Sequence, residues 1–275
     1  MIPQYIYKLD YQNKFFHFIF NIVQFFRCKI KNYIFMIGMK NRLKGNIDSK
    51  YTELQKYKDK YKGKQCFVVA TGPSLNIEDL NKLNKKITFS MNSIVKLMND
   101  NKWNPTFYGI QDKEVYKVFN NEIDRIDKEK STILISGDIS KNKARYKNMV
   151  SFPLNCAYHQ YEIRKDRFYA KFSDNSYAVV YDGYSITYSL IEIAMYMGFS
   201  KIYLLGADCN FLKTGKNHFI EYNLRDRRIE TAGKRNLVGY NKIKEEAKKS
   251  GVEIFNATRG GSLEVFPRVN LDDIV

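Results

Sequence analysis

The sequence has no run of about twenty apolar residues, the length that a helix needs to span a bilayer. It has only four cysteines, Cys28, Cys66, Cys156 and Cys209, which form no CxxC pair and have no histidines placed to complete a zinc site. The N-terminus also lacks the apolar core and small-residue cleavage site of a secretory signal. These absences predict a reduced, cytoplasmic protein without a structural zinc ion.

Acidic residues are in the minority, because 29 Asp and Glu stand against 46 Lys and Arg and give a net charge of +17. A basic excess favours acidic partners, which include nucleic acid, anionic lipid and phosphorylated small molecules. The basic residues are spread along the chain and form no recognisable nucleic-acid module, so nucleic acid is not an expected partner. With 44% hydrophobic residues among 275, the chain can bury one sizeable core, or a core plus an appendage.

Residues 1–50 differ in composition from the rest of the chain. Phenylalanine, isoleucine and valine cluster over 15–26, and six basic residues follow, namely Arg27, Lys29, Lys31, Lys40, Arg42 and Lys44. A helix of this kind suits an anionic membrane surface. It equally suits packing on its own domain or on a second subunit in a homo-oligomer. We therefore divide the chain into a helical segment, 1–50, and an α/β domain, 51–275.

From residue 51 the predicted elements alternate in type. Strands are expected over 65–70, 86–92, 105–110, 131–139, 201–208 and 252–257, and helices over 51–64, 77–83, 93–101, 185–199 and 240–251. The strongest unit is the apolar helix that ends at Gly198 and leads into the strand KIYLLGAD. Strands separated by helices predict a mostly parallel sheet covered on both faces.

The first predicted strand ends in the turn Thr71-Gly72-Pro73-Ser74. In open parallel sheets, ligands bind beyond the carboxyl ends of the strands. Gly72 allows close backbone approach, Pro73 can begin the next helix, and Ser74 can cap that helix or bond a ligand. The functional interpretation is phosphate or ribose binding, and the alternative is an ordinary capped turn, since the spacing is neither GxxxxGK[ST] nor GxGxxG.

Other predicted strands also end in polar residues. These are Asn92, Gln111 with Asp112, and Gly206 with Asp208 and Asn210. Polar groups that leave several neighbouring strands at one edge of a sheet suit a nucleotide site, and a neutral amide such as that of Asn92 can read a base or ribose edge.

The sequence contains three histidines. His17 lies in the Phe-rich segment and is expected to pack there. His159, in the polar and aromatic stretch NCAYHQYEIRKDR, is expected to be structural within a loop or lid. His218 follows the Asp208 strand end by a short loop, where it is either a surface histidine or a base that removes a proton from an acceptor hydroxyl.

The motifs VVATGPSL, SMN, SITYSLIEIAMYMGF, KIYLLGAD and IFNATRGGSLEVFPRVNLDDI together resemble two related groups. One is glycosyltransferase family 42, the bacterial CMP-sialic-acid-dependent sialyltransferases. The other comprises proteins similar to 6-hydroxymethylpterin diphosphokinase, many of them encoded with surface-polysaccharide or flagellin-glycosylation genes. The resemblance covers about 62–275 and implies a Rossmann-like fold of the GT-A-like sialyltransferase type.

The resemblance also implies roles for individual residues. The residues that hold CMP in the sialyltransferases correspond to Gly72, Pro73, Ser74 and Asn92. Those that contact the donor and read the nucleotide correspond to Ser185, Thr187, Gly206 and Asp208. The general base, a histidine downstream, corresponds to His218, which follows Asp208 sooner than in the family. The arginine that precedes the long helix in that family is missing here, and Gly183 stands near its place. The resemblance therefore does not identify the donor sugar.

The C-terminal motif carries Arg259 and Arg268 and resembles the ending of the second group. Arginine forks match phosphate oxygens, so these residues could stabilise a leaving phosphate. The alternative is a closing loop that packs on the sheet.

We therefore predict a bacterial glycosyltransferase of surface-polysaccharide biosynthesis, such as that of capsule or lipooligosaccharide. It would use a CMP-activated or other cytidine-nucleotide sugar and a glycan or lipid-linked acceptor, in the cytoplasm or peripherally on the inner face of the plasma membrane. No DxD pair stands at a suitable strand end, so no obligatory metal ion or other cofactor is expected. The alternatives are a pterin pyrophosphokinase that holds ATP and Mg²⁺ through Asp112 and Asp208, and a non-catalytic membrane-associated scaffold.

Overall fold

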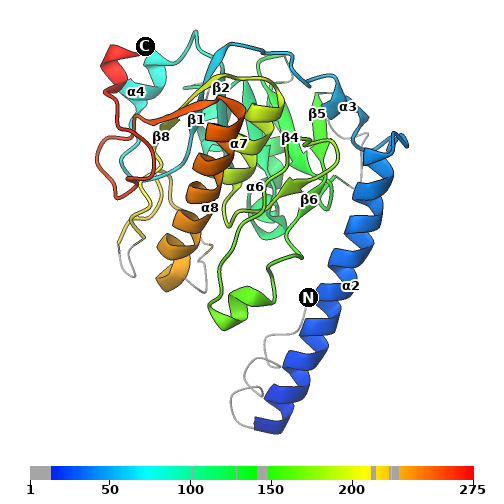
Figure 1. Cartoon of the computed structure of the whole chain (residues 1–275). Coiled ribbons are helices and arrows are strands. Elements are labelled where there is room, and N and C mark those ends of the chain that lie inside the picture. The colour runs from blue at the N-terminus through cyan, green and yellow to red at the C-terminus, as the bar shows by residue number, and fades with distance from the viewer. Residues whose placement is uncertain are drawn as a thin grey trace.

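A computed structural model describes residues 14–100, 102–127, 129–140, 148–211, 215–222, 224 and 229–275. Its centre is a seven-stranded parallel sheet in the order β5-β4-β3-β2-β1-β8-β9 (Figure 1). The strands are β1 (Gln65–Val69), β2 (Thr88–Met91), β3 (Phe107–Ile110), β4 (Thr132–Ser136), β5 (Met149–Phe152), β8 (Lys201–Leu205) and β9 (Glu253–Asn256). The parallel Rossmann-like sheet predicted from the sequence is confirmed.

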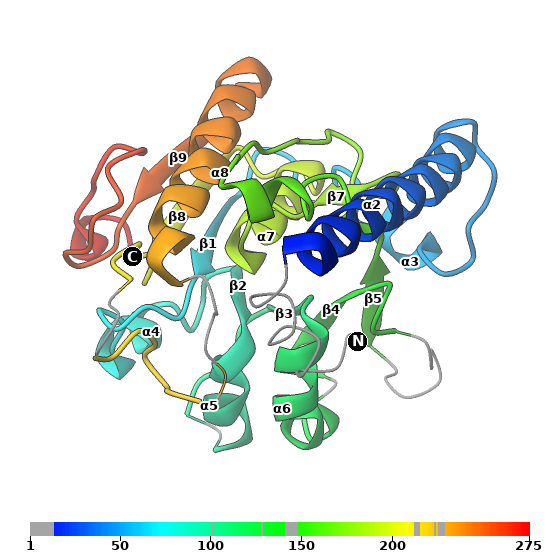
Figure 2. The same ribbon diagram turned by 90° about the horizontal axis from the view of Figure 1, so that it is seen from below.

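Helices cover both faces of this sheet, as Figure 2 shows when it is viewed from below. One face carries α4 (Ile77–Lys82), α5 (Val95–Asn99) and α6 (Lys113–Asp124). The other carries α7 (Ile186–Tyr196) and α8 (Ile229–Ser250), together with the short α3 (Thr52–Gln55) and the long N-terminal α2 (Lys14–Leu43). Alternate residues of β1 point to the two faces, so Cys66 and Val68 belong to one core and Phe67 and Val69 to the other.

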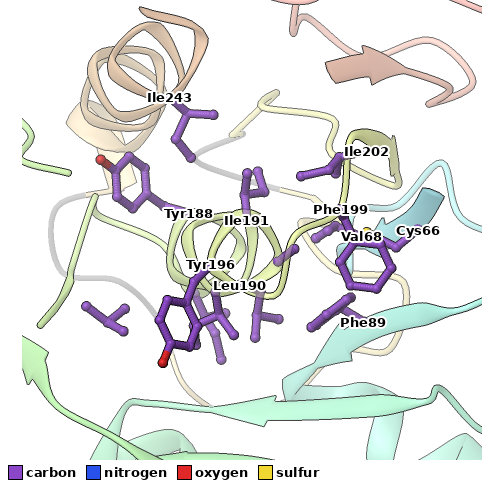
Figure 3. Close-up of a cluster of buried hydrophobic side chains, with 14 of the residues drawn as sticks. Cys66, Val68, Phe89, Tyr188, Leu190, Ile191, Tyr196, Phe199, Ile202 and Ile243 are labelled. Carbon is purple, nitrogen blue, oxygen red and sulfur yellow. The ribbon is translucent and has the colours of Figure 1, made fainter. Parts of the chain in front are cut away.

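Helix α7 lies inside the first of these cores (Figure 3). Leu190, Ile191 and Ile193 are fully buried, because the helix is covered by the sheet on one side and by α8 on the other. Buried aliphatic and aromatic side chains of this size each contribute about 1.5–3 kcal/mol of hydrophobic stabilisation. This packing fixes the N-terminal end of α7 relative to the carboxyl ends of β1 and β2.

The predicted helix over 51–64 is wrong beyond its first turn, because only Thr52–Gln55 is α-helical. The backbone amides of Asp59, Tyr61 and Gly63 instead donate to carbonyl oxygens of Tyr196, Met197 and Gly198 at the end of α7, over 2.8–3.2 Å. A residue such as Asp59, with φ of 54°, cannot continue a helix. Tertiary pairing with the α7 terminus therefore outweighs the helical propensity of this polar segment.

Other elements begin elsewhere than predicted or were not predicted. Helix α8 starts at Ile229 and not at 240, although two glycines lie in its first half. At Gly239 a Cβ would lie 2.5 Å from the carbonyl oxygen of Gly183, so close packing explains the glycine. The sequence also did not predict α6, β5 or the small parallel pair of β6 (Leu154–Asn155) and β7 (Val180–Tyr181).

The C-terminal part of α2 is attached to the α/β domain through Arg42. Its guanidinium donates to the carbonyl oxygen of Ala178 over 2.8 and 3.0 Å and pairs with Asp48 over 3.1 Å. Arg42 is only 8% exposed, and Phe35 and Met39 pack against the core on the same side. Within the described part of the chain, no helix is both long and apolar enough to pass through a membrane.

Glu192 of α7 is fully buried, and its Oε1 accepts a hydrogen bond from the amide of Tyr181 over 3.1 Å. Burial raises the pKa of this carboxyl well above 4.5, and backbone hydrogen bonds from Tyr181 and Ser173 offset only part of the rise. Because the pKa is raised in the folded state, the contribution of this carboxyl to stability is fully present below pH 4.5 and is lost as pH rises towards the folded-state pKa.

We expect Glu192→Gln to remove this loss, because glutamine stays neutral at every pH. Wild-type stability should fall relative to the variant by up to about 1.4 kcal/mol per pH unit above pH 4.5. Urea unfolding of both proteins from pH 5 to 8 checks this difference. Parallel stability curves for the two proteins would show that Glu192 ionises normally.

Candidate nucleotide pocket

The strand order reverses between β1 and β8, because the chain continues from β1 to β2 on one side and β8 pairs with β1 on the other. Ligands of open α/β sheets bind beyond the carboxyl ends of the strands at such a reversal. A cavity of about 1560 Å³ lies there. It is bordered by the segments that follow β1, β2, β3 and β8 and by the N-terminal ends of α7 and α8.

The structure brings most of the predicted site residues to this cavity. Its lining includes Thr71, Gly72, Pro73, Asn92, Gln111, Asp112, Ser185, Thr187, Gly206, Asp208, Asn210 and His218. Ser74 is not part of the lining. The strand ends that carry them are neighbours, since β3, β2, β1 and β8 are consecutive in the sheet.

The Gly72 turn is packed against the end of β8. The Gly72 amide donates to the carbonyl oxygen of Gly206 over 2.9 Å. A Cβ on Gly72 would lie 1.9 Å from Asp208 Oδ2, so the glycine is required by this contact within the protein. The Ser74 hydroxyl donates to the same Asp208 oxygen over 2.8 Å, and its amide donates to Oδ1 over 3.3 Å.

These contacts change the local interpretation of the turn. The cap of α4 is Asn76, whose side chain accepts from the Asp79 amide, and neither Pro73 nor Ser74 begins that helix. Ser74 instead orients Asp208, which is 8% exposed. Burial raises the pKa of Asp208, and the hydrogen bonds from Ser74 lower it in part.

The two C-terminal arginines brace the closing loop and lie outside the cavity lining. Arg259 forms a two-pronged pair with Asp79, with distances of 2.6 and 2.8 Å, and reaches Asp272 over 3.3 Å. Arg268 pairs with Glu264 over 2.6 Å and donates to backbone carbonyl oxygens of the same loop. The loop-closing alternative thus accounts for both residues, because each guanidinium is engaged within the protein.

Asn92, Gln111 and Asp112 form the wall beyond β2 and β3. Asn92, which lines the cavity, has a left-handed φ of 50°, and its carbonyl oxygen accepts from the Tyr108 hydroxyl over 2.8 Å. Gln111 Oε1 is buried and meets no donor among the described residues. Asp112 Oδ1 caps α6 by accepting from the amides of the next turn over 2.7 and 3.0 Å.

The loop that carries His218 is held to the turn after β1 by the next residue, Phe219. The Phe219 amide donates to the carbonyl oxygen of Thr71 over 2.7 Å, and the His218 amide donates to Glu221 Oε1 over 2.8 Å. The imidazole lies 4.9 Å from the ring of Tyr222, measured between centroids. Burial lowers the pKa of His218 below 6.5, with Glu221 opposing the shift, so the imidazole is neutral and able to accept a proton at pH 7.

The cavity lining also includes residues that the sequence did not suggest. Asp182, directly after β7, lines the cavity and accepts the Tyr184 amide through Oδ1 over 2.9 Å. Its Oδ2 lies 3.3 Å from Nε2 of His159, which is buried and stacked on Tyr158 with ring centroids 4.3 Å apart. His159 therefore orients a cavity carboxylate from behind and does not itself line the cavity.

The lining also contains the N-terminal end of α7 and Tyr240 of α8. Ser185 caps α7 by accepting from the Tyr188 amide over 3.3 Å, and Thr187 Oγ1 lies 3.4 Å from the Met91 sulfur. Burial raises the pKa of Tyr240, whose hydroxyl lies beside Thr187 and Ser185, so this group remains protonated. An eleven-residue helix whose N-terminal end faces the cavity offers N–H groups and a positive dipole end to an anion.

Basic side chains complete the lining, namely Lys96, Lys216 and Arg235. No sequence motif marked them, because isolated cations on helices and loops are ordinary surface features in a chain of net charge +17. Among the described residues, no three His, Cys, Asp or Glu side chains gather as metal ligands do. The cavity is thus lined by a helix N-terminus, cations, amides and a neutral imidazole. The helix end and the cations suit a phosphorylated ligand, and the imidazole suits removal of a proton from a second reactant.

Comparison with known proteins assigns the family. Residues 40–214 match the family described as "6-hydroxymethylpterin diphosphokinase MptE-like", and the chain belongs to this family. Among solved structures, it is similar to the MAf glycosyltransferase from Magnetospirillum magneticum AMB-1, with a TM-score of 0.53 and 14% identity. The match covers 82% of this chain but only 39% of that one, so the likeness concerns the fold. No curated protein matches the chain.

Proposed function

We propose that the protein is a glycosyltransferase that takes a sugar from a nucleotide-activated donor, with a CMP-activated or other cytidine-nucleotide sugar as the expected donor. The observation that carries this proposal is the position of His218. The hydrogen bond from Phe219 to Thr71 holds its loop at the end of β1, so that a neutral imidazole borders the same cavity as the α7 N-terminus. A base and an anion-binding helix end in one cavity are the two elements that displacement of a nucleotide requires.

In this proposal the donor lies across the carboxyl ends of β1, β2 and β3. Asn92 and Gln111 present amide groups to the base or ribose. The N-terminal end of α7, with Ser185 and Thr187, and the guanidinium of Arg235 face the phosphate. Asp208, held by Ser74, fixes the end of β8 against this nucleotide.

Transfer then needs one proton to move. His218 removes the proton of the acceptor hydroxyl as the oxygen attacks the anomeric carbon, and the bond from that carbon to the nucleotide phosphate breaks. The departing phosphate carries the electron pair and is stabilised by the α7 N-terminus and the cations. The resemblance of its motifs to proteins encoded with surface-polysaccharide genes supports a glycan or lipid-linked acceptor in this proposal.

The name of the family makes a pyrophosphokinase the second candidate. That reaction needs carboxylates to hold Mg²⁺ between phosphates, and the cavity offers Asp112 and Asp208. Asp112 Oδ1 is already engaged by two backbone amides and both oxygens of Asp208 by Ser74. These engagements favour the metal-independent transferase.

Ligand-dependent thermal stability distinguishes the candidates. We expect CMP or CDP to raise the Tm in EDTA, because a ligand at 100 times its Kd adds about 2.7 kcal/mol of stability. UDP, GDP and ATP, each with and without Mg²⁺, are the comparison set. A response to ATP that requires Mg²⁺ would favour the kinase, and no response to any nucleotide would leave a non-catalytic scaffold.

A further inference from the structure

Helix α2 presents two opposite faces with different surroundings. One face contacts the α/β domain: Asn32 accepts from the Asn155 side chain over 3.0 Å, and Phe25 packs edge-on against Tyr161 at 5.0 Å. Together with Phe35, Met39 and Arg42, these residues pack α2 on its own domain, which is one of the alternatives that the sequence left open.

The opposite face is apolar and exposed. Large hydrophobic side chains recur there every three or four positions and are each 40–68% exposed, namely Ile19, Ile22, Val23, Phe26, Ile30, Tyr33, Ile34 and Ile37. Soluble domains rarely leave so continuous a stripe open to water. Its spacing is that of a single side of an α-helix, so one flat partner can cover the whole stripe.

The positive charge of α2 indicates what kind of partner covers the exposed stripe. The exposed cations of this region are Arg27, Lys29, Lys31, Lys40 and Lys44, and no Asp or Glu occurs from 14 to 47. In a two-fold pairing of two copies the same faces meet, so the cations of one helix would approach the cations of the other, with no carboxylate on either helix over 14–47. An anionic bilayer supplies the opposite charge and takes apolar side chains at the same time.

We propose that the exposed stripe of α2, Ile19 to Ile37 on the side away from the domain, lies in the interface of an anionic lipid bilayer. The helix binds along the surface, since none of the described helices is suited to cross a membrane. The apolar side chains enter the boundary between headgroups and acyl chains, and the flanking cations contact lipid phosphates.

The location of α2 relates this surface to the cavity. Figure 1 shows the N-terminal half of α2 extending past the domain on the same side as the N-terminal end of α8, which borders the cavity. Surface binding would therefore hold the cavity near a lipid-anchored acceptor. This last consequence rests on the proposed function, whereas the binding itself does not.

Flotation of the full chain with vesicles tests the proposal. We expect binding to vesicles of phosphatidylcholine with 30% phosphatidylglycerol, no binding to pure phosphatidylcholine, and weaker binding in 0.5 M NaCl. Ile30→Glu with Ile34→Glu should reduce binding to the anionic vesicles at least about tenfold, because two carboxylates then enter the apolar stripe. The matched control, Leu237→Glu with Val275→Glu, adds the same charge at exposed apolar residues outside α2 and should bind as wild type does.

A second pair of variants changes charge alone. Arg27→Glu with Lys29→Glu should also reduce binding about tenfold or more, whereas Lys58→Glu with Lys85→Glu on the domain should not. Nucleotide-dependent Tm shifts should be equal in all variants, which separates this result from a failure of the proposed function. Absence of wild-type binding to anionic vesicles would overturn the proposal. So would a stable wild-type dimer that the α2 variants convert to a monomer while vesicle binding stays unchanged.

Discussion

Replacing His218 with alanine is expected to slow sugar transfer by about 10²- to 10⁴-fold, the usual contribution of a general base. Nucleotide affinity should stay nearly unchanged, because the backbone contacts of this loop to Thr71 and Glu221 do not involve the imidazole. Initial rates with saturating donor and acceptor, together with calorimetric titration of CMP, measure the two quantities separately.

The pH profile gives this prediction a sharper form. The wild-type rate should rise with pH along a limb whose midpoint lies below 6.5, since burial lowers the pKa of His218 and only the neutral imidazole accepts a proton. The His218→Ala variant should lack that limb. Asn217→Ala, at the neighbouring position of the same loop, serves as the control and should keep it. A limb that persists without His218 would assign the base to another group of the cavity, with Asp182 the first to examine.

Gly72→Ala is expected to disrupt the junction between the ends of β1 and β8. The new Cβ would lie 1.9 Å from Asp208 Oδ2 and 2.5 Å from the carbonyl oxygen of Gly206, and the second of these is backbone, which cannot rotate away. Overpacking of this kind costs about 2–3 kcal/mol. For a domain of this size, that corresponds to a fall in Tm of about 5–10 °C.

The same substitution should abolish nucleotide-dependent stabilisation, because the displaced turn also carries Thr71, which holds the His218 loop. Gly233→Ala in α8 is the matched control: its Cβ would meet nothing closer than 3.8 Å, and alanine favours a helix over glycine by about 1 kcal/mol. Thermal unfolding with and without CMP compares the two. A Gly72→Ala protein with wild-type Tm and an intact CMP response would show that the turn adjusts without this contact.

The sheet could be predicted because its strands follow rules that act locally. Buried runs such as QCFVV and KIYLL end at glycine-containing turns, and the helix that precedes KIYLL combines helical spacing with a left-handed Gly198 at its end, where φ is 90°. Elements that depend on distant contacts were missed. Strands of two residues, such as β6 and β7, are too short to show an alternation of apolar and polar residues. The segment after Gln55 is not helical because its backbone amides donate hydrogen bonds to carbonyl oxygens at the end of α7.

The cavity was predicted in part for the same reason. A polar residue after a buried strand is visible in sequence, which pointed to Asn92, Gln111 and Asp208. Asp182 obeys the same rule, but its strand is too short to be recognised. Arg235 reaches the cavity only because α8 begins eleven residues before the predicted 240, and His159 lies behind Asp182 only because a long connection folds back. Such contacts depend on packing between segments far apart in the chain.

A crystal structure of the protein with CMP, grown in EDTA, would show directly whether the cavity is a cytidine-nucleotide site. We expect the cytidine to lie against Asn92 and Gln111, and the phosphate to lie at the N-terminal end of α7 beside Arg235. His218 should then face the open position next to that phosphate, where the sugar and acceptor would meet. CMP bound elsewhere, or a cavity that takes ATP with Mg²⁺ and leaves CMP unbound at millimolar concentration, would contradict it.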